Sequence, residues 1–176
     1  MMAKARMLTA RTTHLEMHKP PAKRTQMPSG PRLALMRTQD MPLAFYRHLY
    51  EQIGKAHHWT DRRHLDDDAL SSLIHAKSTE IWVLYYDGSP AGYFELDMAR
   101  LPNEAELAYF GLAPDFQGRG LSRFFLSEAI FAAFAHQPGR LVVHTNVLDS
   151  PRALQLYQKL GFAPYAWTDE EIEPFE

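Results

Sequence analysis

The most informative stretch of the sequence is Gln117-Gly118-Arg119-Gly120-Leu121-Ser122, which joins a predicted strand to a predicted helix. Its two glycines let the backbone take positive φ angles and approach a ligand without interference from a Cβ atom. Successive N–H groups at the start of the following helix point outward at the positive end of the helix dipole. The stretch therefore predicts an anion site suited to phosphate, with a plain structural turn as the alternative that these residues alone leave open.

Two other kinds of phosphate loop do not fit this stretch. A dinucleotide-binding fingerprint requires a third glycine where Arg123 stands. A nucleoside-triphosphate loop requires Gly-Lys-Ser/Thr, which the sequence lacks at this point. Nicotinamide dinucleotides and nucleoside triphosphates are therefore not the expected ligands.

Hydrophobic periodicity on both sides of the loop predicts elements in the order β, β, α, α, β, β, β, α, β, α, β. The strands are expected at residues 12–17, 33–37, 81–86, 91–97, 104–112, 141–146 and 162–167, and the helices at 42–53, from 65 onward, at 120–136 and at 151–160. The pair Asp87-Gly88 predicts a hairpin turn, which Ser89-Pro90 is expected to lengthen beyond two residues. Antiparallel strands followed by one βαβ unit indicate a mixed sheet with helices on its faces.

Composition indicates an ordinary globular domain, with 176 residues, 45% hydrophobic residues and a formal charge of −2. The chain has no cysteine, which excludes disulfides and thiolate chemistry and makes a reducing, cytoplasmic location the expectation. No apolar stretch reaches the roughly 18 residues that span a bilayer, so no membrane association is expected.

Charge is distributed unevenly along the chain. The first forty residues carry eight Lys or Arg, among them Lys4, Arg6 and Arg11. A basic arm can bind nucleic acid, but here the charges alternate with Pro, Met and Thr, so a solvated lead-in strand without nucleic acid is favoured. The last eight residues carry five acids, which are interpreted as a solvated end or, alternatively, as an attraction for a cationic substrate.

Two blocks together suggest a family. Residues 112–122 resemble the cofactor motif Gln/Arg-x-x-Gly-x-Gly/Ala of the GCN5-related N-acetyltransferase (GNAT) superfamily. Residues 153–162 resemble its second hallmark, a helix ending in Tyr-x-Lys-x-Gly-Phe. The resemblance covers residues 32–168 and implies a single-domain α/β (α+β) GNAT fold. That fold has a central, mixed, mostly antiparallel sheet, helices on both faces, and splayed central strands. Residues 1–31 are then a lead-in strand and loop, and 32–176 the acetyltransferase domain.

The resemblance implies direct transfer of an acetyl group from acetyl-CoA to a primary amine. The cofactor-binding residues that it implies are Gly111, Leu112, Ala113, Gln117, Gly118, Arg119, Gly120, Leu121, Ser122 and Ser150. The first three would hold the pantetheine arm and polarise the thioester, and the loop would hold the pyrophosphate. Ser122 departs from the family's final Gly/Ala, and Ser150 stands where many members have Asn, so Ser150 either bonds the cofactor or only caps a helix.

Two residues match catalytic positions of the family. Tyr157 matches the tyrosine that acts as general acid toward the departing thiolate; the alternative is a core tyrosine. Glu106 is the candidate base, because a lone carboxylate in an apolar strand is costly to bury and burial is expected to raise its pKa. Strand alternation predicts Glu106, Ala108 and Phe110 on one face, opposite Leu107 and Tyr109. A salt bridge for Glu106 remains open, and Glu95 is the competing carboxylate, as the base or as a ligand of the substrate amine.

The histidine-rich segment of residues 57–64 lies between the first two predicted helices, where family members often frame the acceptor site. His58 and Trp59 are the candidate substrate contacts, although ordinary loop residues are the favoured interpretation. The spacing of the histidines matches no common ligand pattern, so no metal is expected. His144, on a central strand, is interpreted as a hydrogen-bonded core residue.

Several alternatives stay open at this stage. A catalytically silent GNAT-fold module that binds or senses CoA is the second hypothesis, because Ser122 and Ser150 depart from the family pattern. The acceptor, a small amine or a peptide or protein amine, cannot be identified from these residues. Family members are often dimers, so the resemblance suggests a homodimer.

Overall fold

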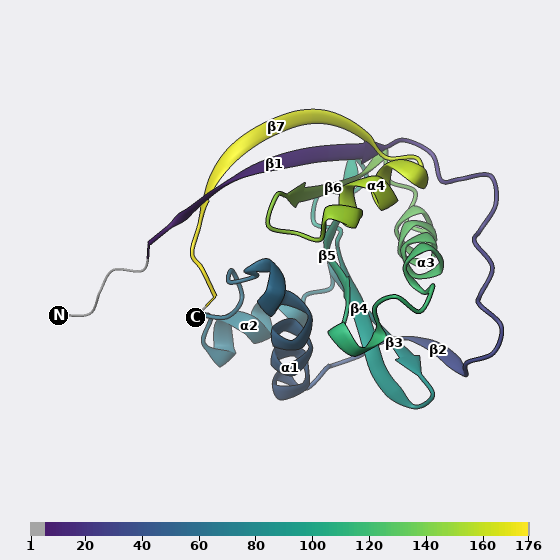
Figure 1. Ribbon diagram of the computed structural model, residues 1–176, viewed down its shortest axis with the longest axis horizontal. Helices are drawn as coiled ribbons and strands as arrows, with labels where there is room; N and C mark the ends of the chain where they lie inside the picture. Colours follow the sequence, from purple (N-terminus) through teal and green to yellow (C-terminus); the bar gives the residue numbers. More distant parts are fainter. Residues whose placement is uncertain (1–5, 176) are drawn as a thin grey trace.

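The computed structural model describes residues 6–175 of the chain, so Lys4 of the basic segment lies outside the described residues (Figure 1). The strands are β1 (Leu8–Met17), β2 (Leu33–Arg37), β3 (Thr79–Tyr86), β4 (Ser89–Asp97), β5 (Glu104–Leu112), β6 (Arg140–Asn146) and β7 (Ala163–Ile172). The helices are α1 (Leu43–Gly54), α2 (Asp67–Ile74), α3 (Ser122–Phe134) and α4 (Pro151–Lys159), with short 3-10 helices at Lys55–His57 and Pro114–Phe116. The predicted order of strands and α-helices is confirmed.

The seven strands form one sheet in the order β2-β3-β4-β5-β6-β1-β7. Neighbouring strands are antiparallel except β5 and β6, which are parallel. This confirms the mixed, mostly antiparallel sheet. The N-terminal strand β1 is hydrogen-bonded on both sides, to β6 and to β7, and the β1/β7 pair arches over the rest of the molecule (Figure 1).

Helices cover both faces of the sheet, as predicted, and each face has its own hydrophobic core. Helices α3 and α4 pack on one face, where Phe94, Phe125 and Tyr157 belong to the same buried cluster. Helices α1 and α2 pack on the other, where Tyr46, Leu70 and Tyr93 belong to a second cluster. Burying each of these large side chains stabilises the fold by roughly 1.5–3 kcal/mol.

Helix α3 is apolar on nearly all sides, which is typical of a helix that is covered from more than one direction. One side packs on the sheet, and the segment between β1 and β2 crosses another. In that segment the N–H of Thr25 donates to Oγ of Ser127 at 2.9 Å, and Arg24 pairs with Glu128 at 3.1 Å. The residues before β2 therefore complete the burial of α3.

Two boundaries differ from the sequence-based prediction. The β3–β4 turn has only two residues, because Tyr86 pairs directly with Ser89 and both Asp87 and Gly88 take positive φ angles, +46° and +89°. The expected longer loop is wrong, since the tight turn suits the twist of a hairpin. Strand β7 continues to Ile172 instead of ending near Trp167, because its antiparallel pairing with β1 extends to Leu8.

Strand β5 contains a bulge that the prediction of simple alternation missed. Glu95 of β4 pairs with Tyr109 and Leu96 with Leu107, so Ala108 is the extra residue. A bulge resets the side-chain alternation. Leu107 and Phe110 consequently face the α3 side, whereas Tyr109 packs with the α1 cluster. The predicted grouping of Glu106 with Phe110 is therefore wrong.

The splayed central strands are confirmed. Strands β5 and β6 pair only from Glu104 opposite Arg140 to Glu106 opposite Val142. Beyond this point β5 continues to Leu112 and β6 to Asn146 without pairing to each other. The backbone groups that face this gap are left for a ligand or solvent.

Among residues 6–175, no helix combines the length and the apolar character that crossing a bilayer requires.

Candidate functional site

A cavity of about 1060 Å³ opens where β5 and β6 separate. Residues of β5 from Leu107 to Leu112 form one wall, and Val143, His144 and Asn146 of β6 contribute to the other. The 117–123 loop lies at one end, and residues 57–64 with the end of β7 lie at the other. The cavity thus connects the two faces of the sheet through the gap between the strands.

The predicted phosphate loop reaches this cavity with Gln117, Gly118, Gly120 and Ser122. Gly118 and Gly120 have φ angles of +73° and +74°, which few other residues adopt without strain. An added Cβ at either glycine would meet no atom within 4 Å, so both face open space. Helix α3 begins at Ser122, which directs its first amides toward this end of the cavity.

Three residues of the predicted cofactor set do not line the cavity. The N–H of Ala113 donates to the carbonyl of Ala91 at 2.8 Å and is part of the sheet. Leu121 is buried in the core. The guanidinium of Arg119 stacks over the rings of Tyr86 and Phe116, at 5.0 and 5.1 Å from their centroids. Cation–π contacts of this kind hold Arg119 on the outer side of the loop.

Gly111, Leu112 and Ser150 all line the cavity, as the predicted cofactor site requires. Nε2 of Gln117 donates to the carbonyl of Leu112 at 3.2 Å, which ties the loop to the end of β5. Ser150 is the N-cap of α4, with Oγ accepting from the N–H of Arg152 at 3.4 Å. Ser150 therefore caps the helix and also lies at the cavity surface.

Tyr157 projects from α4 into the same cavity and is only 6% exposed. Its ring packs between those of Phe110 and Phe162, with centroids 6.4 and 5.7 Å away. Burial, together with the negative charge of Asp149, raises the pKa of the phenol well above its ordinary value. Tyr157 is thus a protonated phenol at neutral pH, which is the state required of a proton donor.

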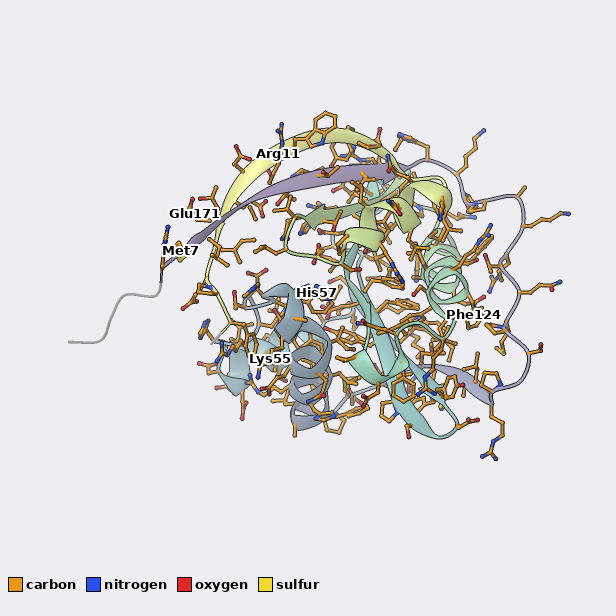
Figure 2. The ribbon with its side chains drawn as sticks, in the orientation of Figure 1. Met7, Arg11, Lys55, His57, Phe124 and Glu171 are labelled. Atoms are coloured by element: carbon orange, nitrogen blue, oxygen red, sulfur yellow. The ribbon has the colours of Figure 1, made fainter. Side chains whose placement is uncertain are left out.

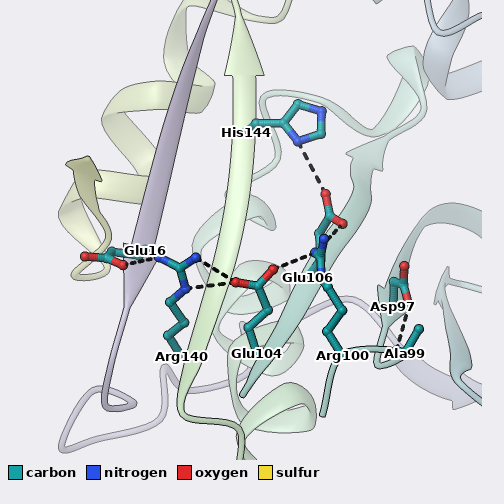
Figure 3. A network of polar contacts seen from close by, with 8 residues as sticks. All are labelled: Glu16, Asp97, Ala99, Arg100, Glu104, Glu106, Arg140 and His144. Atoms are coloured by element: carbon teal, nitrogen blue, oxygen red, sulfur yellow. Dashed lines mark hydrogen bonds and ion pairs between the residues drawn. The ribbon is translucent and has the colours of Figure 1, made fainter. Parts of the chain in front are cut away.

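Glu106 lies on the α1 side of β5, opposite Leu107, and is paired rather than isolated (Figure 3). Its Oε1 lies 3.4 Å from Nδ1 of His144, and its Oε2 lies 3.2 Å from Nη2 of Arg100. The hydrogen bond to His144 and the charge of Arg100 lower the pKa of Glu106 in spite of its partial burial. The expected rise of this pKa is therefore wrong, and the salt bridge left open by the sequence is present. Glu106 itself does not line the cavity.

His144 corrects a second expectation. Its side chain is 45% exposed and lines the cavity, so it is not a core histidine. The hydrogen bond to Glu106 raises the pKa of His144 against the effect of burial, with smaller contributions from Glu170 and Asp149. His144 lies two residues beyond Val142, the last residue of β6 that pairs with β5, which explains why a central-strand residue reaches open space.

Glu95 is not available to a substrate in this arrangement. It is 1% exposed and does not line the cavity. Arg62 pairs with its Oε1 at 2.6 Å, and the hydroxyl of Tyr46 donates to its Oε2 at 2.7 Å. Since Arg62 also lies over the ring of Tyr109, Glu95 anchors the layer between α1 and the sheet rather than facing an amine.

The 57–64 segment forms another part of the cavity wall, with His57, His58, Trp59 and Asp61 on the cavity surface. Trp59 packs on Tyr109, with ring centroids 5.1 Å apart. Nδ1 of His58 accepts from the N–H of Phe175 at 2.9 Å, so the end of the chain folds back on this segment. Figure 2 shows His57 across from Met7 and Glu171 at the end of the β1/β7 ribbon.

Sequence reasoning missed the acidic side chains that line the cavity, which are Asp61, Asp149, Glu170, Glu171 and Glu173. The last three were interpreted chiefly as a solvated end, but the pairing of β7 with β1 brings Glu170 and Glu171 to the cavity, and Glu173 follows the strand directly. The one available signal was the density of acids at the C-terminus. Within residues 6–175, no three His, Cys, Asp or Glu side chains form a group that could hold a metal ion.

Comparison with known proteins agrees with this geometry. The profile described as "Acetyltransferase (GNAT) family" matches residues 43–162 of the chain. No curated protein sequence matches it. The structure is similar to an acetyltransferase of Novosphingobium aromaticivorans described as a putative GNAT-family member, with 16% identity and a TM-score of 0.65 over 98% of this chain and 68% of the other.

Two further structures are similar. One is a tandem GNAT protein from the clavulanic acid biosynthesis pathway, with 16% identity and a TM-score of 0.64 over 98% of this chain and 56% of the other. The second is the aminoglycoside N-acetyltransferase AAC(6')-Iy in complex with CoA, with 18% identity and a TM-score of 0.56 over 78% of this chain and 92% of the other. At these identities the likeness concerns the fold alone, and the chain spans little more than half of the tandem protein.

Proposed function

The chain belongs to the acetyltransferase (GNAT) family, and on that premise we propose that it transfers the acetyl group of acetyl-CoA directly to a primary amine. The observation that carries the proposal is the cavity, which runs from the glycine loop through the gap between β5 and β6 to an acidic and aromatic end. Such a path accommodates a long thioester on one side and its acceptor on the other.

The loop supports binding of the pyrophosphate. Gly118 and Gly120 leave the backbone open toward the cavity, and the first amides of α3 follow directly. Arg123, on the first turn of α3, also lines this end and supplies positive charge. Ser122 narrows the space relative to glycine but adds a hydroxyl donor. The residues present therefore fit a diphosphate.

The gap between the strands supports binding of the pantetheine arm. Gly111 and Leu112 lie on the part of β5 that no longer pairs with β6, and both line the cavity. An added Cβ at Gly111 would lie 2.5 Å from Cγ2 of Ile53, so α1 packs against this strand with no room for a side chain. When bound, acetyl-CoA supplies an activated thioester.

Tyr157 is proposed as the proton donor to the leaving sulfur. Its raised pKa keeps the hydroxyl protonated, and the hydroxyl makes no side-chain hydrogen bond to any residue in 6–175, so it is available to a ligand. On the opposite side of the gap, Oε1 of Glu106 lies 3.4 Å from Nδ1 of His144, and the amine is proposed to lose its proton next to this pair. General acid and general base catalysis each contribute about 10²–10⁴-fold to such reactions.

The acceptor end favours a cationic amine. It is lined by Asp61, Glu170, Glu171 and Glu173, with Trp59 and Tyr109 as aromatic walls. Negative charge and aromatic faces both attract ammonium groups. The similar enzyme AAC(6')-Iy is an aminoglycoside N-acetyltransferase, which makes amines with several positive charges the first acceptors to test. A peptide or protein amine remains the second class. The cytoplasmic location and the homodimeric state stay predictions.

A catalytically silent module that binds CoA is the second candidate. It is favoured by Ser122 in the phosphate loop and by the lowered pKa of Glu106, which weakens that carboxylate as a base. The two candidates share the cofactor site and differ only in turnover.

Two measurements test the proposal in sequence. A thermal-shift titration with acetyl-CoA is expected to raise the melting temperature, because a ligand that binds only the folded state stabilises it. Thiol release is then followed with spermidine, kanamycin, lysine amide and a lysine-containing peptide. Turnover with at least one amine supports the enzyme. No stabilisation at millimolar acetyl-CoA would overturn both candidates, and stabilisation without thiol release across the panel would favour the silent module.

A further inference from the structure

His144 lies on β6 where this strand has separated from β5, and its side chain lines the cavity. It lies two residues beyond Val142, the last residue of β6 that pairs with β5. Leu141 and Val143 belong to the core on the α3 side, so alternation along β6 turns His144 to the opposite, acceptor-facing side. Its ring thus stands at the boundary between the cofactor half and the acceptor half of the cavity.

Access distinguishes His144 from its partner. His144 lines the cavity with a side chain that is 45% exposed, whereas Glu106 is 22% exposed and does not line it. A group that removes a proton from a bound amine must come within hydrogen-bond distance of that amine. Of the two members of the pair, only His144 meets this condition.

The pairing also determines which imidazole nitrogen is free. Glu106 is ionised, because His144 and Arg100 lower its pKa, and a carboxylate only accepts hydrogen bonds. Nδ1 of His144, 3.4 Å from Oε1 of Glu106, therefore carries the proton in the neutral ring. Nε2 is then left with its lone pair, and within residues 6–175 it has no hydrogen-bond partner; in Figure 3 it points away from Glu106.

We propose that His144, through Nε2, accepts the proton of the attacking amine, and that Glu106 is the positioning residue that orients its ring. The inference rests on the proposed acetyltransferase function. It replaces the direct role first predicted for Glu106 with an indirect one, and it explains why a carboxylate that lies behind the cavity wall is buried beside this histidine.

The amine nitrogen forms a bond to the acyl carbon, the carbon–sulfur bond breaks, and its electron pair stays on sulfur. The nitrogen proton passes to Nε2 of His144, and the hydroxyl of Tyr157 gives its proton to sulfur. His144 then releases its proton to water, and Tyr157 regains one. The net products are the acetylated amine and the free thiol.

Charged and titratable groups surround His144 from several elements. Glu106 of β5 faces Nδ1, with Arg100 behind it. Glu170 of β7 and Asp149 after β6 add negative charge and raise the pKa of His144 further. The ring of His14 on β1 lies 5.8 Å away between centroids. Since the imidazole acts as a base only when neutral, activity is expected to rise with pH through the folded pKa of His144.

A structural readout tests the pairing without turnover. The imidazole of His144 is titrated by NMR in the wild type and in Glu106→Gln. The wild type is expected to titrate above about pH 6.5, the ordinary value, and the variant lower, because a neutral amide no longer stabilises the imidazolium. Amide spectra confirm that the variant is folded. Identical titration in both proteins would overturn the positioning role.

Kinetics test the proton transfer. Release of CoA from acetyl-CoA is measured with kanamycin and, separately, with water as acceptor. His144→Asn keeps an N–H for Glu106 but lacks Nε2, and kcat/KM is expected to fall about 100-fold. Glu106→Gln is expected to remain active with its rising pH limb moved to lower pH. The control His48→Asn, at an exposed histidine of α1 that does not line the cavity, is expected to match the wild type.

The outcomes separate the two proposals. A wild type that releases CoA, together with an active His144→Asn, overturns the role of His144 and leaves the acetyltransferase intact. Loss of turnover in Glu106→Gln with retention in His144→Asn assigns the base to Glu106. A wild type that releases no CoA with water, spermidine, kanamycin, lysine amide or the lysine-containing peptide overturns both proposals.

Discussion

The two ends of the cavity are built in different ways. The cofactor end comes from one continuous stretch, residues 117–123, and from one helix, α4. The acceptor end is assembled from residues 57–64, His144 and the end of β7, which are far apart in the chain. The first depends on local backbone geometry, whereas the second depends on long-range strand pairing. Changes at the two ends should therefore have separable consequences.

The largest effect is expected from the buried ion pair behind the acceptor end. Arg62→Ala leaves Glu95 charged and without its partner in a buried site, and the free energy of unfolding is expected to fall by about 3–5 kcal/mol. Urea unfolding measures the loss. Arg47→Ala, which removes a pair with the exposed Asp67, is the matched control and is expected to cost less than about 1 kcal/mol.

Acetyl-CoA affinity of Arg62→Ala, measured below its melting temperature, should stay close to that of the wild type. A tenfold weaker acetyl-CoA affinity in Arg62→Ala would contradict the independence of the two ends of the cavity. A free energy of unfolding of Arg62→Ala no lower than that of Arg47→Ala would contradict the stabilising role of the buried pair.

The next effect concerns turnover on the cofactor side. Tyr157→Phe removes the proton donor but keeps the ring packed between Phe110 and Phe162, so kcat is expected to fall about 100-fold with little change in KM for acetyl-CoA. Tyr165→Phe, at an exposed tyrosine of β7, is the control and should match the wild type. An unchanged kcat in Tyr157→Phe would contradict the role of Tyr157 as proton donor and would indicate that its role is structural.

A smaller effect is expected from the phosphate loop. Gly120→Ala forces a Cβ into a left-handed backbone position that faces the cavity, and KM for acetyl-CoA is expected to rise about tenfold, with about 1 kcal/mol of lost stability. Gly30→Ala is the matched control, since Gly30 also has a positive φ, +114°, with open space around it. Gly30→Ala should lose similar stability with unchanged KM. Equal KM values in the two variants would contradict the assignment of the loop.

The smallest effect is the pH dependence of the Glu106–His144 pair. The lowered pKa of Glu106 stabilises the fold above about pH 4.3, and this contribution is lost as pH falls through its folded pKa. The raised pKa of His144 contributes fully below about pH 6.5 and loses its effect as pH rises through its folded value.

The stability difference between the wild type and Glu106→Gln should therefore be greatest between these limits. It should stay below about 1 kcal/mol, because His144 is half exposed and solvent screens the pair. Urea unfolding at several pH values measures it. The variant Glu51→Gln, at an exposed position of α1, should show no such maximum. A difference that keeps growing above pH 7 would contradict the pairing.

The contrast between the two ends also explains what the sequence could and could not predict. The glycine loop and Tyr157 were singled out because each lies in a short block, residues 112–122 and 153–162, that resembles a motif of the family. The order of the elements followed from hydrophobic periodicity in the same way. Both kinds of signal are contained within single segments.

Other features were missed because they arise from pairing between distant segments. The bulge at Ala108 follows from the register of β5 against β4, and the residue type of Ala108 does not predict it. His144 was assigned to the core because the prediction could not locate where β6 leaves β5. The acids of β7 reach the cavity only because β1 extends the pairing to Ile172.

Backbone amide NMR during a titration with acetyl-CoA tests the division of the cavity most directly. The account predicts the largest shifts at Gly118, Gly120 and Ser122, with the amides of Gly111 and Leu112 following and those of α2 unaffected. Saturating shifts confined to residues 57–64 and the end of β7, with the 117–122 amides unchanged, would contradict it.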